Sequence, residues 1–383
     1  MKLRKFFHTS LLAAALAACL LFCLTGVASA TGEITIESAL DTAEMFSDRD
    51  LSQTADLTDA AYFALSDGED IHITAAGVYA LSGAASDVTV YVEAGDDDKV
   101  QLVLDDVSIE NADFPCIYVK SADKVFITTA ADSSLSVTGT FAADGETNTD
   151  GVIFSRDDLT LNGTAELTIS STCNGVVTKD DLKVTGGSYV ITADSKCFEA
   201  NDSIRVADGT FSLEAGTDAL HAENDDDDSL GYVYISGGDF TIQSGDDGIH
   251  GNSVVQIDGG TLDISAGEGI EATYIQVNDG EIYIGSWDDG VNGAAKSASY
   301  WPTIEINGGY ITVVMSSGDT DGIDCKGNII VNGGTIDVSG QSTFDYDGSG
   351  QYNGGTIIVN GQQVSSLPNQ MGMGGRGGHR NWG

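Results

Sequence analysis

A short phrase recurs along the chain and constrains its fold more than any other feature. An acidic residue, a glycine and an apolar residue stand together at 247–249, 268–270, 289–291 and 321–323, and each is followed by a β-branched run and a turn with one or two glycines. The closing glycines of these turns, from Gly187 to Gly355, are separated by 22, 29, 22, 20, 29, 25 and 21 residues. Internal repetition at this period predicts a solenoid, in which each unit packs only on its neighbours.

The runs between the turns are short, alternating and rich in β-branched residues, as in Leu262-Asp263-Ile264 and Ile304-Glu305-Ile306. About three such strands fit into one unit with turns between them. We therefore predict an all-β fold, namely a right-handed parallel β-helix with about 22 residues per coil. A β-propeller fits less well because its blades repeat at about 40–45 residues.

Composition changes divide the chain into four predicted parts. Residues 1–30 read as a signal peptide, and 31–66 as an N-terminal linker or cap in which 36–57 forms either a short helix or a linker. The β-helix is predicted over 67–362, with insertions at 224–231 and 294–302 that map to loops on one side. The Gly-rich residues 363–383 are predicted to be a disordered tail.

The first 30 residues predict export. Lys2, Arg4 and Lys5 precede a long apolar stretch, and Ala28-Ser29-Ala30 is a cleavage site of the A-x-A type. We expect a secreted or cell-surface protein cleaved after Ala30, with lipid attachment at Cys19 as the alternative. No second segment is long and apolar enough to predict a transmembrane span.

The charge balance limits the partners. With 16 Lys+Arg against 59 Asp+Glu, the formal net charge is −43. Nucleic acid is not expected to bind because phosphate recognition needs a basic surface. We expect a monomer.

The repeated acidic residues suggest a cofactor. Stacked coils would bring equivalent carboxylates to roughly 5 Å from one another, where like charges repel unless a cation lies among them. Oxygen ligands favour Ca²⁺. The candidate ligands are Asp246, Asp247, Glu268, Glu271, Asp288, Asp289, Asn292, Asp321 and Asp324. The alternative is that each Asp-Gly is only a turn with its carboxylate in water.

Catalysis on these carboxylates is the competing interpretation. Residues 148–151 and 245–251 echo polygalacturonase-type glycosidases, in which paired Asp residues act as acid and base. The two fragments are about four coils apart, however, and no Arg-x-Lys clamp follows. A lyase would need a basic residue beside Ca²⁺, and Lys326 and Lys179 are the nearest options. We predict no catalytic residue and no enzymatic activity.

Aromatic residues are candidates for carbohydrate binding, and cysteine residues are candidates for disulfide bonds. Trp287, Tyr300 and Trp301 lie in a turn or an insertion, where their rings could stack on sugar rings. Cys116, Cys173, Cys197 and Cys325 remain after cleavage, and their pairing stays open. Cys173 and Cys197 could bridge neighbouring coils, or all four could be small buried side chains.

Several ordered motifs resemble one bacterial family. They are the stretches 99–109 and 122–127, Gly-Asp-Asp-Gly-Ile at 245–249, Glu-Gly-Ile-Glu at 268–271 and Asp-Asp-Gly-Val-Asn at 288–292. Together they are similar to the carbohydrate-binding domain-containing proteins, secreted parallel β-helices shaped like polysaccharide lyases. The likeness covers about residues 70–362.

The resemblance implies Ca²⁺ binding and recognition of plant-wall polysaccharide, either cellulose or an acidic pectin-like glycan, without demonstrated catalysis. Residues 199–201 replace the Asp-Gly phrase in their coil, so metal ligands are not carried over to that coil. The expected function is a non-catalytic, calcium-dependent carbohydrate-binding protein. The alternatives are a polygalacturonase- or pectate-lyase-like enzyme and a structural surface adhesin.

Overall fold

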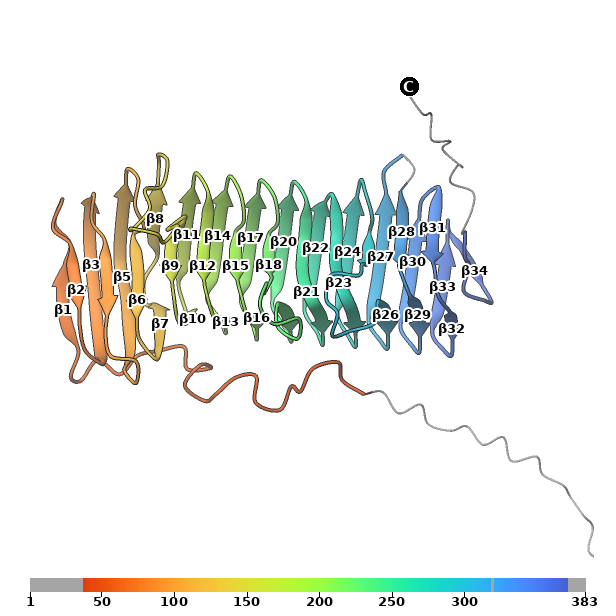
Figure 1. The fold of residues 1–383 in the computed structure, drawn as a ribbon, viewed down its shortest axis with the longest axis horizontal. Helices are drawn as coiled ribbons and strands as arrows, with labels where there is room; N and C mark the ends of the chain where they lie inside the picture. Colours follow the sequence, from red (N-terminus) through yellow and green to blue (C-terminus); the bar gives the residue numbers. More distant parts are fainter. Residues whose placement is uncertain (1–36, 318–319, 371–383) are drawn as a thin grey trace, which may run out of the picture. The chain divides into compact units, whose positions relative to one another are not determined.

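The computed structural model describes residues 37–317 and 320–370, and this part of the chain is built from strands. No α-helix occurs among the described residues. The strands follow one another from the orange to the blue end of the ribbon (Figure 1). The predicted signal peptide, Cys19 and residues 371–383 of the predicted tail lie outside the described residues.

The strands form three columns, because each strand pairs in parallel with its equivalent one coil later. In one column, for example, β11 pairs with β14, β14 with β17, and β17 with β20. The long strands β21 and β23 pass from one column into the next, as do β3 and β5. The all-β prediction is confirmed, and the arrangement is that of a β-helix-like solenoid. Its right-handed winding stays a prediction.

The bounds of the strands are as follows. The first column contains β2 (Ile71–Ile73), β4 (Val90–Glu93), β6 (Ile117–Ser121), β9 (Gly151–Ser155), β12 (Asn174–Thr178), β15 (Phe198–Ala200), β18 (Leu220–Ala222), β21 (Asp247–Ile257), β23 (Glu268–Val277), β25 (Val291–Gly293), β28 (Asp321–Cys325) and β31 (Ser342–Tyr346). The second column contains β1 (Ala61–Ala64), β3 (Gly77–Ser86), β5 (Lys99–Asn111), β7 (Lys124–Thr129), β10 (Asp158–Gly163), β13 (Asp181–Val184), β16 (Ser203–Val206), β19 (Tyr232–Ile235), the ends of β21 and β23, β26 (Thr303–Ile306), β29 (Asn328–Val331) and β32 (Gly350–Tyr352). The third column contains the ends of β3 and β5, β8 (Ser133–Val137), β11 (Glu166–Ser171), β14 (Ser188–Ala193), β17 (Thr210–Ala215), β20 (Asp239–Ser244), β22 (Thr261–Ala266), β24 (Glu281–Ser286), β27 (Tyr310–Met315), β30 (Thr335–Ser339), β33 (Thr356–Val359) and the antiparallel β34 (Gln362–Val364).

The core is made of side chains that stack from coil to coil inside these columns. In the third column, Ile242 aligns with Ile264 and Ile264 with Ile284, and all three are buried. Residues between them point outward, which gives β22 its alternating pattern of exposed and buried positions. Burial of these ladders supplies the main driving force for folding.

Two separate physical requirements explain the glycines of the repeat. Gly334 closes a turn at φ 74°, a left-handed conformation that a Cβ strains, and its counterparts Gly260 and Gly309 also have positive φ. Gly269, in the acidic phrase, instead faces the interior, where a Cβ would collide with the carbonyl oxygen of Gly290 and with Ile284. Packing therefore explains the glycine of the acidic phrase but not the acidic residue before it.

Residues 37–57, which we call the strap, run along the outer side of the second column before the chain enters its first coil (Figure 1). Backbone amides of Ala39 and Leu40 donate to the side-chain oxygens of Gln276 and Gln256, both at 2.9 Å. Further along, the carboxylate of Asp50 lies 2.9 Å from Lys124 Nζ. The strap consists of turns and bends rather than the short helix considered above. It connects coils that are distant in sequence.

The two ends of the solenoid extend beyond the predicted repeat. Strand β1 pairs with β3 although it precedes residue 67, where the β-helix was predicted to begin. At the other end, β34 pairs with β33, and Gln370 donates its backbone amide to Phe344 at 2.9 Å. Of these residues, Gln363, Val364 and Gln370 lie in the segment predicted as a disordered tail.

Candidate functional site

Charged and polar side chains gather on the first column between β18 and β31, at two positions per coil that are three residues apart. Strand pairing aligns Asp247 with Glu268 at the first position. At the second position strand pairing aligns a longer series, namely His221, His250, Glu271, Asn292, Asp324 and Asp345. We call this series, together with the acidic residues at the first position, the acidic row.

In the N-terminal half of the acidic row, cationic side chains already neutralise the carboxylates. His250 Nδ1 lies 2.7 Å from Asp247 Oδ2 and 3.0 Å from Glu271 Oε2, and Lys296 Nζ lies 2.9 Å from the same Glu271 oxygen. The His221 ring stacks on the His250 ring at 4.6 Å, and its Nδ1 lies 2.7 Å from Asp218 Oδ2.

This half of the row holds a charged histidine. Burial opposes protonation of His250, but the hydrogen bonds that its ring donates to Asp247 and Glu271 outweigh this effect and raise its pKa to about 9. The three groups lie close enough to hold a metal ion. The His250 ring lies between the two carboxylates, and in its protonated form it would neutralise them without a metal ion.

Asn292 lies in the middle of the acidic row, between the half that contains cationic side chains and the half that contains few. Its amide nitrogen donates to Glu268 Oε2 at 2.9 Å and to Glu271 Oε1 at 3.2 Å. Its amide oxygen is buried and has no hydrogen-bond partner. Burial is the main reason that the pKa of Glu268 rises to about 8, and repulsion from Glu271 adds to it. An orphaned buried oxygen beside acidic groups fits a position that accepts a cation or a hydrogen-bond donor.

In the C-terminal half, carboxylates face each other with few cations. Oxygens of Asp321, Asp324 and Asp345 lie within 4.8 Å of one another. One oxygen of Asp345 is buried without a hydrogen-bond partner, and among the described carboxylates Lys326 Nζ forms an ion pair with Asp324 alone, at 2.9 Å. Burial and then repulsion from Asp321 and Asp324 raise the pKa of Asp345. This cluster fits a hard divalent cation with oxygen ligands.

The structure brings most of the predicted metal ligands together, but not all of them. It brings Asp247, Glu268, Glu271, Asp289, Asn292, Asp321 and Asp324 into the acidic row. Asp246 and Asp288 are exposed in the turns just before it. Sequence reasoning missed Asp345, because its coil lacks the acidic-glycine phrase. Its spacing from Asp324, which is close to one repeat, was the available signal.

The predicted sugar-stacking residues also differ in their surroundings. Trp287 is 49% exposed and Trp301 is 67% exposed. Tyr300 is half-buried, and its ring centroid lies 6.2 Å from that of Tyr274. The insertion that carries Trp301 is tied to the acidic row through the ion pair between Lys296 and Glu271. Trp301 thus lies on an insertion that contacts the acidic row, and Trp287 precedes Asp289 of that row by two residues.

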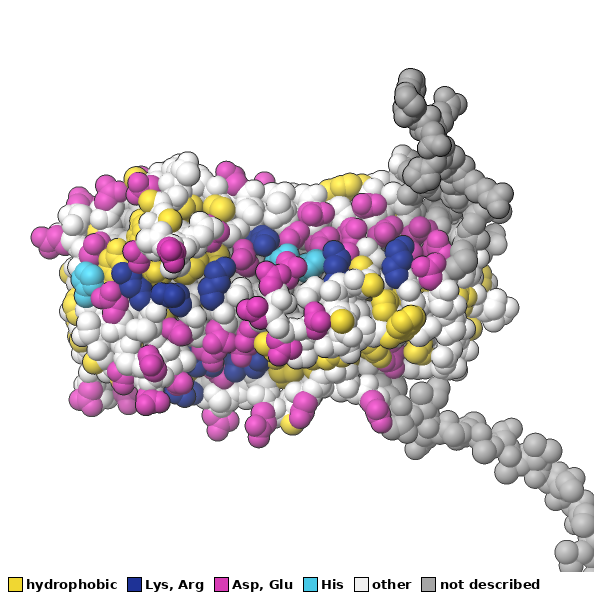
Figure 2. Space-filling view, in the orientation of Figure 1, with side chains coloured by type: hydrophobic (Ala, Val, Ile, Leu, Met, Phe, Trp, Pro, Cys, Tyr) yellow, Lys and Arg dark blue, Asp and Glu magenta, His cyan; other side chains and the backbone are white. Residues whose placement is uncertain are grey.

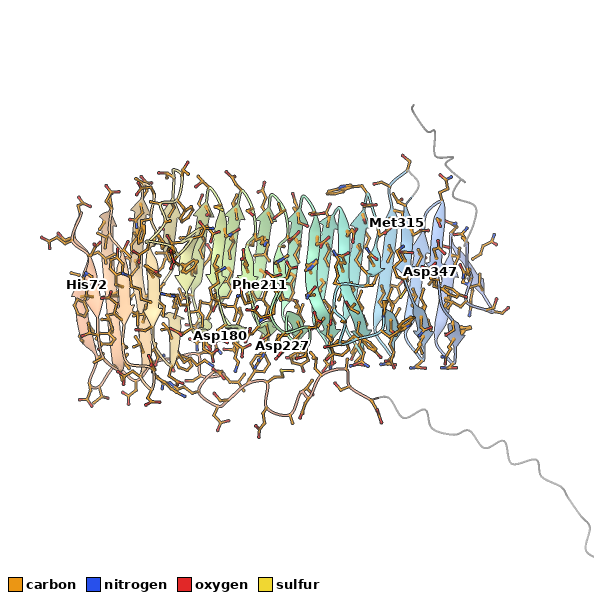
Figure 3. All side chains as sticks on the ribbon, viewed as in Figure 1. His72, Asp180, Phe211, Asp227, Met315 and Asp347 are labelled. Atoms are coloured by element: carbon orange, nitrogen blue, oxygen red, sulfur yellow. The ribbon has the colours of Figure 1, made fainter. Side chains whose placement is uncertain are left out.

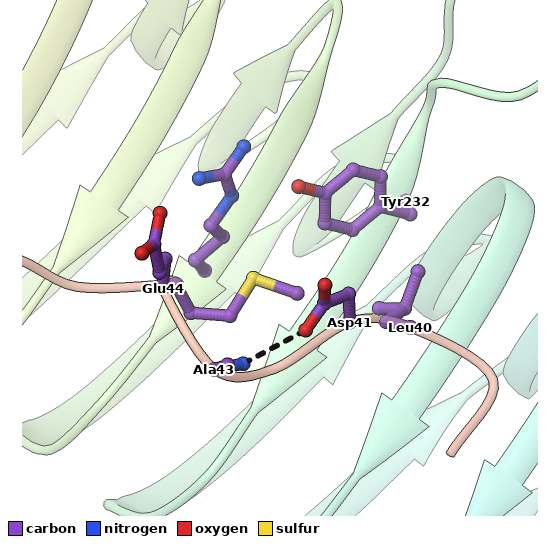
Figure 4. A pocket seen from close by; sticks show the side chains of 7 residues that line it. Leu40, Asp41, Ala43, Glu44 and Tyr232 are labelled. Atoms are coloured by element: carbon purple, nitrogen blue, oxygen red, sulfur yellow. Dashed lines mark hydrogen bonds between the residues drawn. The ribbon is translucent and has the colours of Figure 1, made fainter. Parts of the chain in front are cut away.

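Two further features lie on the second column. Asp158, Asp180 and Asp181 form another acidic group, with Asp180 labelled in Figure 3, and burial followed by repulsion from Asp158 raises the pKa of Asp180 to about 7. Arg205 lies 2.7 Å from Asp181. The same arginine lines a pocket of about 400 Å³ with Tyr232 and strap residues (Figure 4). Because this guanidinium is already paired, the pocket lacks a free charged group from the solenoid.

The four cysteines within the described residues are free thiols. Cys116, Cys197 and Cys325 are buried, and burial raises the pKa of the Cys325 thiol to about 11. The proposed bridge between Cys173 and Cys197 is absent. The interpretation as small buried side chains is confirmed for these three, whereas Cys173 is half-buried.

Comparison with known proteins identifies the family. Residues 67–322 match the profile of the carbohydrate-binding domain-containing proteins. The chain belongs to this family. A relative of the same description from Acetivibrio thermocellus is 36% identical over 129 residues, which is 32% of this chain and 45% of the relative. The chain thus spans less than half of that relative's length.

A solved structure is also similar. It is the polysaccharide lyase-like protein from C. thermocellum, in a gadolinium derivative, with 22% identity, 77% of this chain and 98% of that chain covered, and a TM-score of 0.45. A likeness at this level carries no argument about this chain. Within the described residues, no helix is long and apolar enough to cross a membrane.

Proposed function

We propose that this protein is a secreted, non-catalytic carbohydrate-binding protein that holds an acidic plant-wall type polysaccharide through Ca²⁺. Family membership supports carbohydrate binding. The calcium dependence rests on the residues of the C-terminal half of the acidic row.

The observation that carries the proposal is the pair of orphaned oxygens beside three carboxylates. Asn292 Oδ1 and Asp345 Oδ1 are buried without partners; Asp345 belongs to the cluster with Asp321 and Asp324, and Asn292 aligns with Asp324 on the preceding coil. An ion here would satisfy these oxygens and remove the repulsion between neighbouring carboxylates. Asp289 would add a further oxygen, since its carboxylate already accepts the amide of Asp321 at 2.9 Å.

Calcium explains how an acidic protein binds an acidic ligand. Bound at the edge of the solenoid, the ion would keep coordination positions for carboxylates of the glycan, because Ca²⁺ accepts six to eight oxygen ligands. Trp301, on the adjoining insertion, would stack on a sugar ring.

Binding of polygalacturonate to the purified protein, measured by calorimetry with calcium and with a chelator, tests the proposal. We expect binding in calcium that is strongly weakened in chelator and restored by adding calcium. Equal affinity in both buffers would overturn the calcium dependence, and absence of binding in both would overturn the ligand class. Cellulose serves as the neutral comparison.

A second candidate is cleavage of the polysaccharide, favoured by the buried His250 between Asp247 and Glu271 with Lys296 beside them. A basic side chain near a calcium site is what a lyase requires. Both cations are ion-paired, which argues for a structural role. Release of reducing ends or of an unsaturated product from polygalacturonate would establish this candidate.

A further inference from the structure

Basic side chains stand in register on consecutive coils of the first column, N-terminal to the acidic row. Val119 aligns with Ser155 and Ser155 with Thr178, so the residues that follow them, Lys120, Arg156 and Lys179, occupy equivalent positions. The backbone amide of Arg156 donates to Val119 at 3.1 Å, and that of Lys179 to Ser155 at 2.9 Å, which fixes this alignment. Coils stack at about 4.8 Å, so the three cations lie one coil apart.

Such a series is unexpected in this chain. Only 16 residues are Lys or Arg, against 59 that are Asp or Glu. Like charges one coil apart repel one another, as the carboxylates of the acidic row do. The basic row, as we call Lys120, Arg156 and Lys179, therefore needs anions beside it.

Aromatic rings hold the two lysines of the basic row in place. Lys120 Nζ lies 4.9 Å from the ring centroid of Tyr91 and 5.2 Å from that of Tyr118. Lys179 Nζ lies 5.7 Å from the centroid of Phe154. These cation–π contacts orient the ammonium groups before any ligand arrives.

The protein supplies anions to the ends of the row but not to its centre. Lys120 pairs with Glu93 at 3.5 Å and with Asp144 at 3.3 Å, and Lys179 pairs with Glu199 at 3.4 Å. Arg156 is exposed and forms no ion pair within 4.0 Å among the described residues, although its charge acts on the adjacent Asp157. Its five N–H donors are thus free for a carboxylate or a sulfate, which a guanidinium binds through two hydrogen bonds.

The basic row lies on the line that the acidic row continues. Figure 2 shows Lys and Arg side chains in a row that leads toward two adjacent histidines, with Asp and Glu side chains beyond them. The column order agrees, since β6, β9 and β12 precede β18 and β21, which carry His221 and His250. A ligand that lies along this column could touch both rows.

We propose that Lys120, Arg156 and Lys179 form a second anion-binding site, which holds carboxylate or sulfate groups of an acidic glycan running along the first column. The inference rests on the proposed function and extends it with a site that needs no calcium. Glycan units would be held directly by cations at the N-terminal coils and through Ca²⁺ at the C-terminal coils.

The test measures polygalacturonate affinity of the full chain by calorimetry, with calcium and with chelator, for Arg156→Gln, Arg156→Lys and the triple Gln variant of the basic row. The matched control is Lys99→Gln. Lys99 is an exposed cation at the start of β5 in the second column, and it pairs with Asp123 at 3.2 Å. A sulfated glycan replaces polygalacturonate in a second arm to distinguish the two anions.

We expect Arg156→Gln to weaken binding about three- to tenfold, Arg156→Lys to weaken it less, and Lys99→Gln to stay within about twofold of wild type. Calcium affinity and melting temperature should be unchanged in Arg156→Gln, and residual binding in chelator should fall with salt. Wild-type affinity of the triple variant would overturn this inference alone. Failure of the wild type to bind either anionic glycan would overturn the proposed function together with it.

Discussion

Removal of the Asp50 carboxylate tests whether the strap holds distant coils together. Asp50 is 1% exposed, and its two carboxylate oxygens lie 2.9 Å from Lys124 Nζ and 3.6 Å from Lys183 Nζ. Thr160 donates a further hydrogen bond at 3.1 Å. In Asp50→Ala, both buried lysines would lose this counter-charge.

The expected cost follows from that burial. Breaking a buried ion pair from one side costs about 3–5 kcal/mol, because the remaining charge stays desolvated. Lys124 keeps Asp158 at 3.9 Å, so we expect the lower end, about 3 kcal/mol. With about 2.1 cal/mol/K of unfolding entropy per residue over roughly 330 residues, this corresponds to a fall in Tm of about 4 °C.

Acid should produce the same loss in the wild type. Burial is the largest influence on Asp50 and opposes its ionisation, but hydrogen bonds from Lys124 and Ser47 outweigh it and hold its pKa well below the ordinary value of 3.8. A carboxyl with a depressed folded-state pKa stabilises the fold above its unfolded pKa. Its contribution is therefore lost as pH falls below about 4.

Differential scanning calorimetry of Asp50→Ala, with hydrogen exchange of strap amides, measures the effect. The matched control is Asp48→Ala, which removes an exposed carboxylate from the same strap. Equal melting temperatures for the two variants, with unchanged exchange at Ala39 and Leu40, would refute the reasoning. Solenoid units couple mainly to their nearest neighbours, so faster exchange at the distant Gln256 coil would show that the strap adds long-range coupling.

Three further predictions concern the first column and its aromatic neighbours. Asp324→Asn should lower calcium affinity at least about tenfold in calorimetry, whereas Asp288→Asn, an exposed carboxylate, should leave it unchanged. The pKa of Glu268 is raised to about 8 from an ordinary 4.5, so the wild type should lose stability as pH rises between these values. In calcium-free buffer, Glu268→Gln should therefore make Tm fall less steeply with pH. A decline that persists in the variant would contradict this assignment. Trp301→Ala should weaken glycan binding several-fold without changing Tm, and Tyr62→Ala, 71% exposed at the other end, should change neither.

Much of the fold was predictable because one repeat fixes both strand and turn positions. The spacing of Gly260, Gly309 and Gly334 identified turns that have positive φ. The alternating runs such as Leu262-Asp263-Ile264 identified the buried side of β22. The strap was not predictable, since its contacts, such as Leu40 with Gln256, join residues far apart in a segment without periodicity.

The sequence predicted which residues make up the candidate site, but not that half of them are neutralised by cationic side chains. The aligned carboxylates were expected from the repeat, and Asp321 and Asp324 do lie together. Only three-dimensional contacts show that His250 and Lys296 neutralise one half, since Lys296 comes from an insertion. The position of Asn292, with its amide oxygen unpartnered, depends likewise on the orientation of a side chain that no spacing determines.

A crystal structure of the protein grown with calcium tests the central claim most directly. We predict one ion among Asp321, Asp324 and Asp345, at about 2.3–2.6 Å from their oxygens, with Asn292 Oδ1 turned toward it. Carboxylates that stand apart in saturating calcium, each hydrated separately and with no ion between them, would contradict the account.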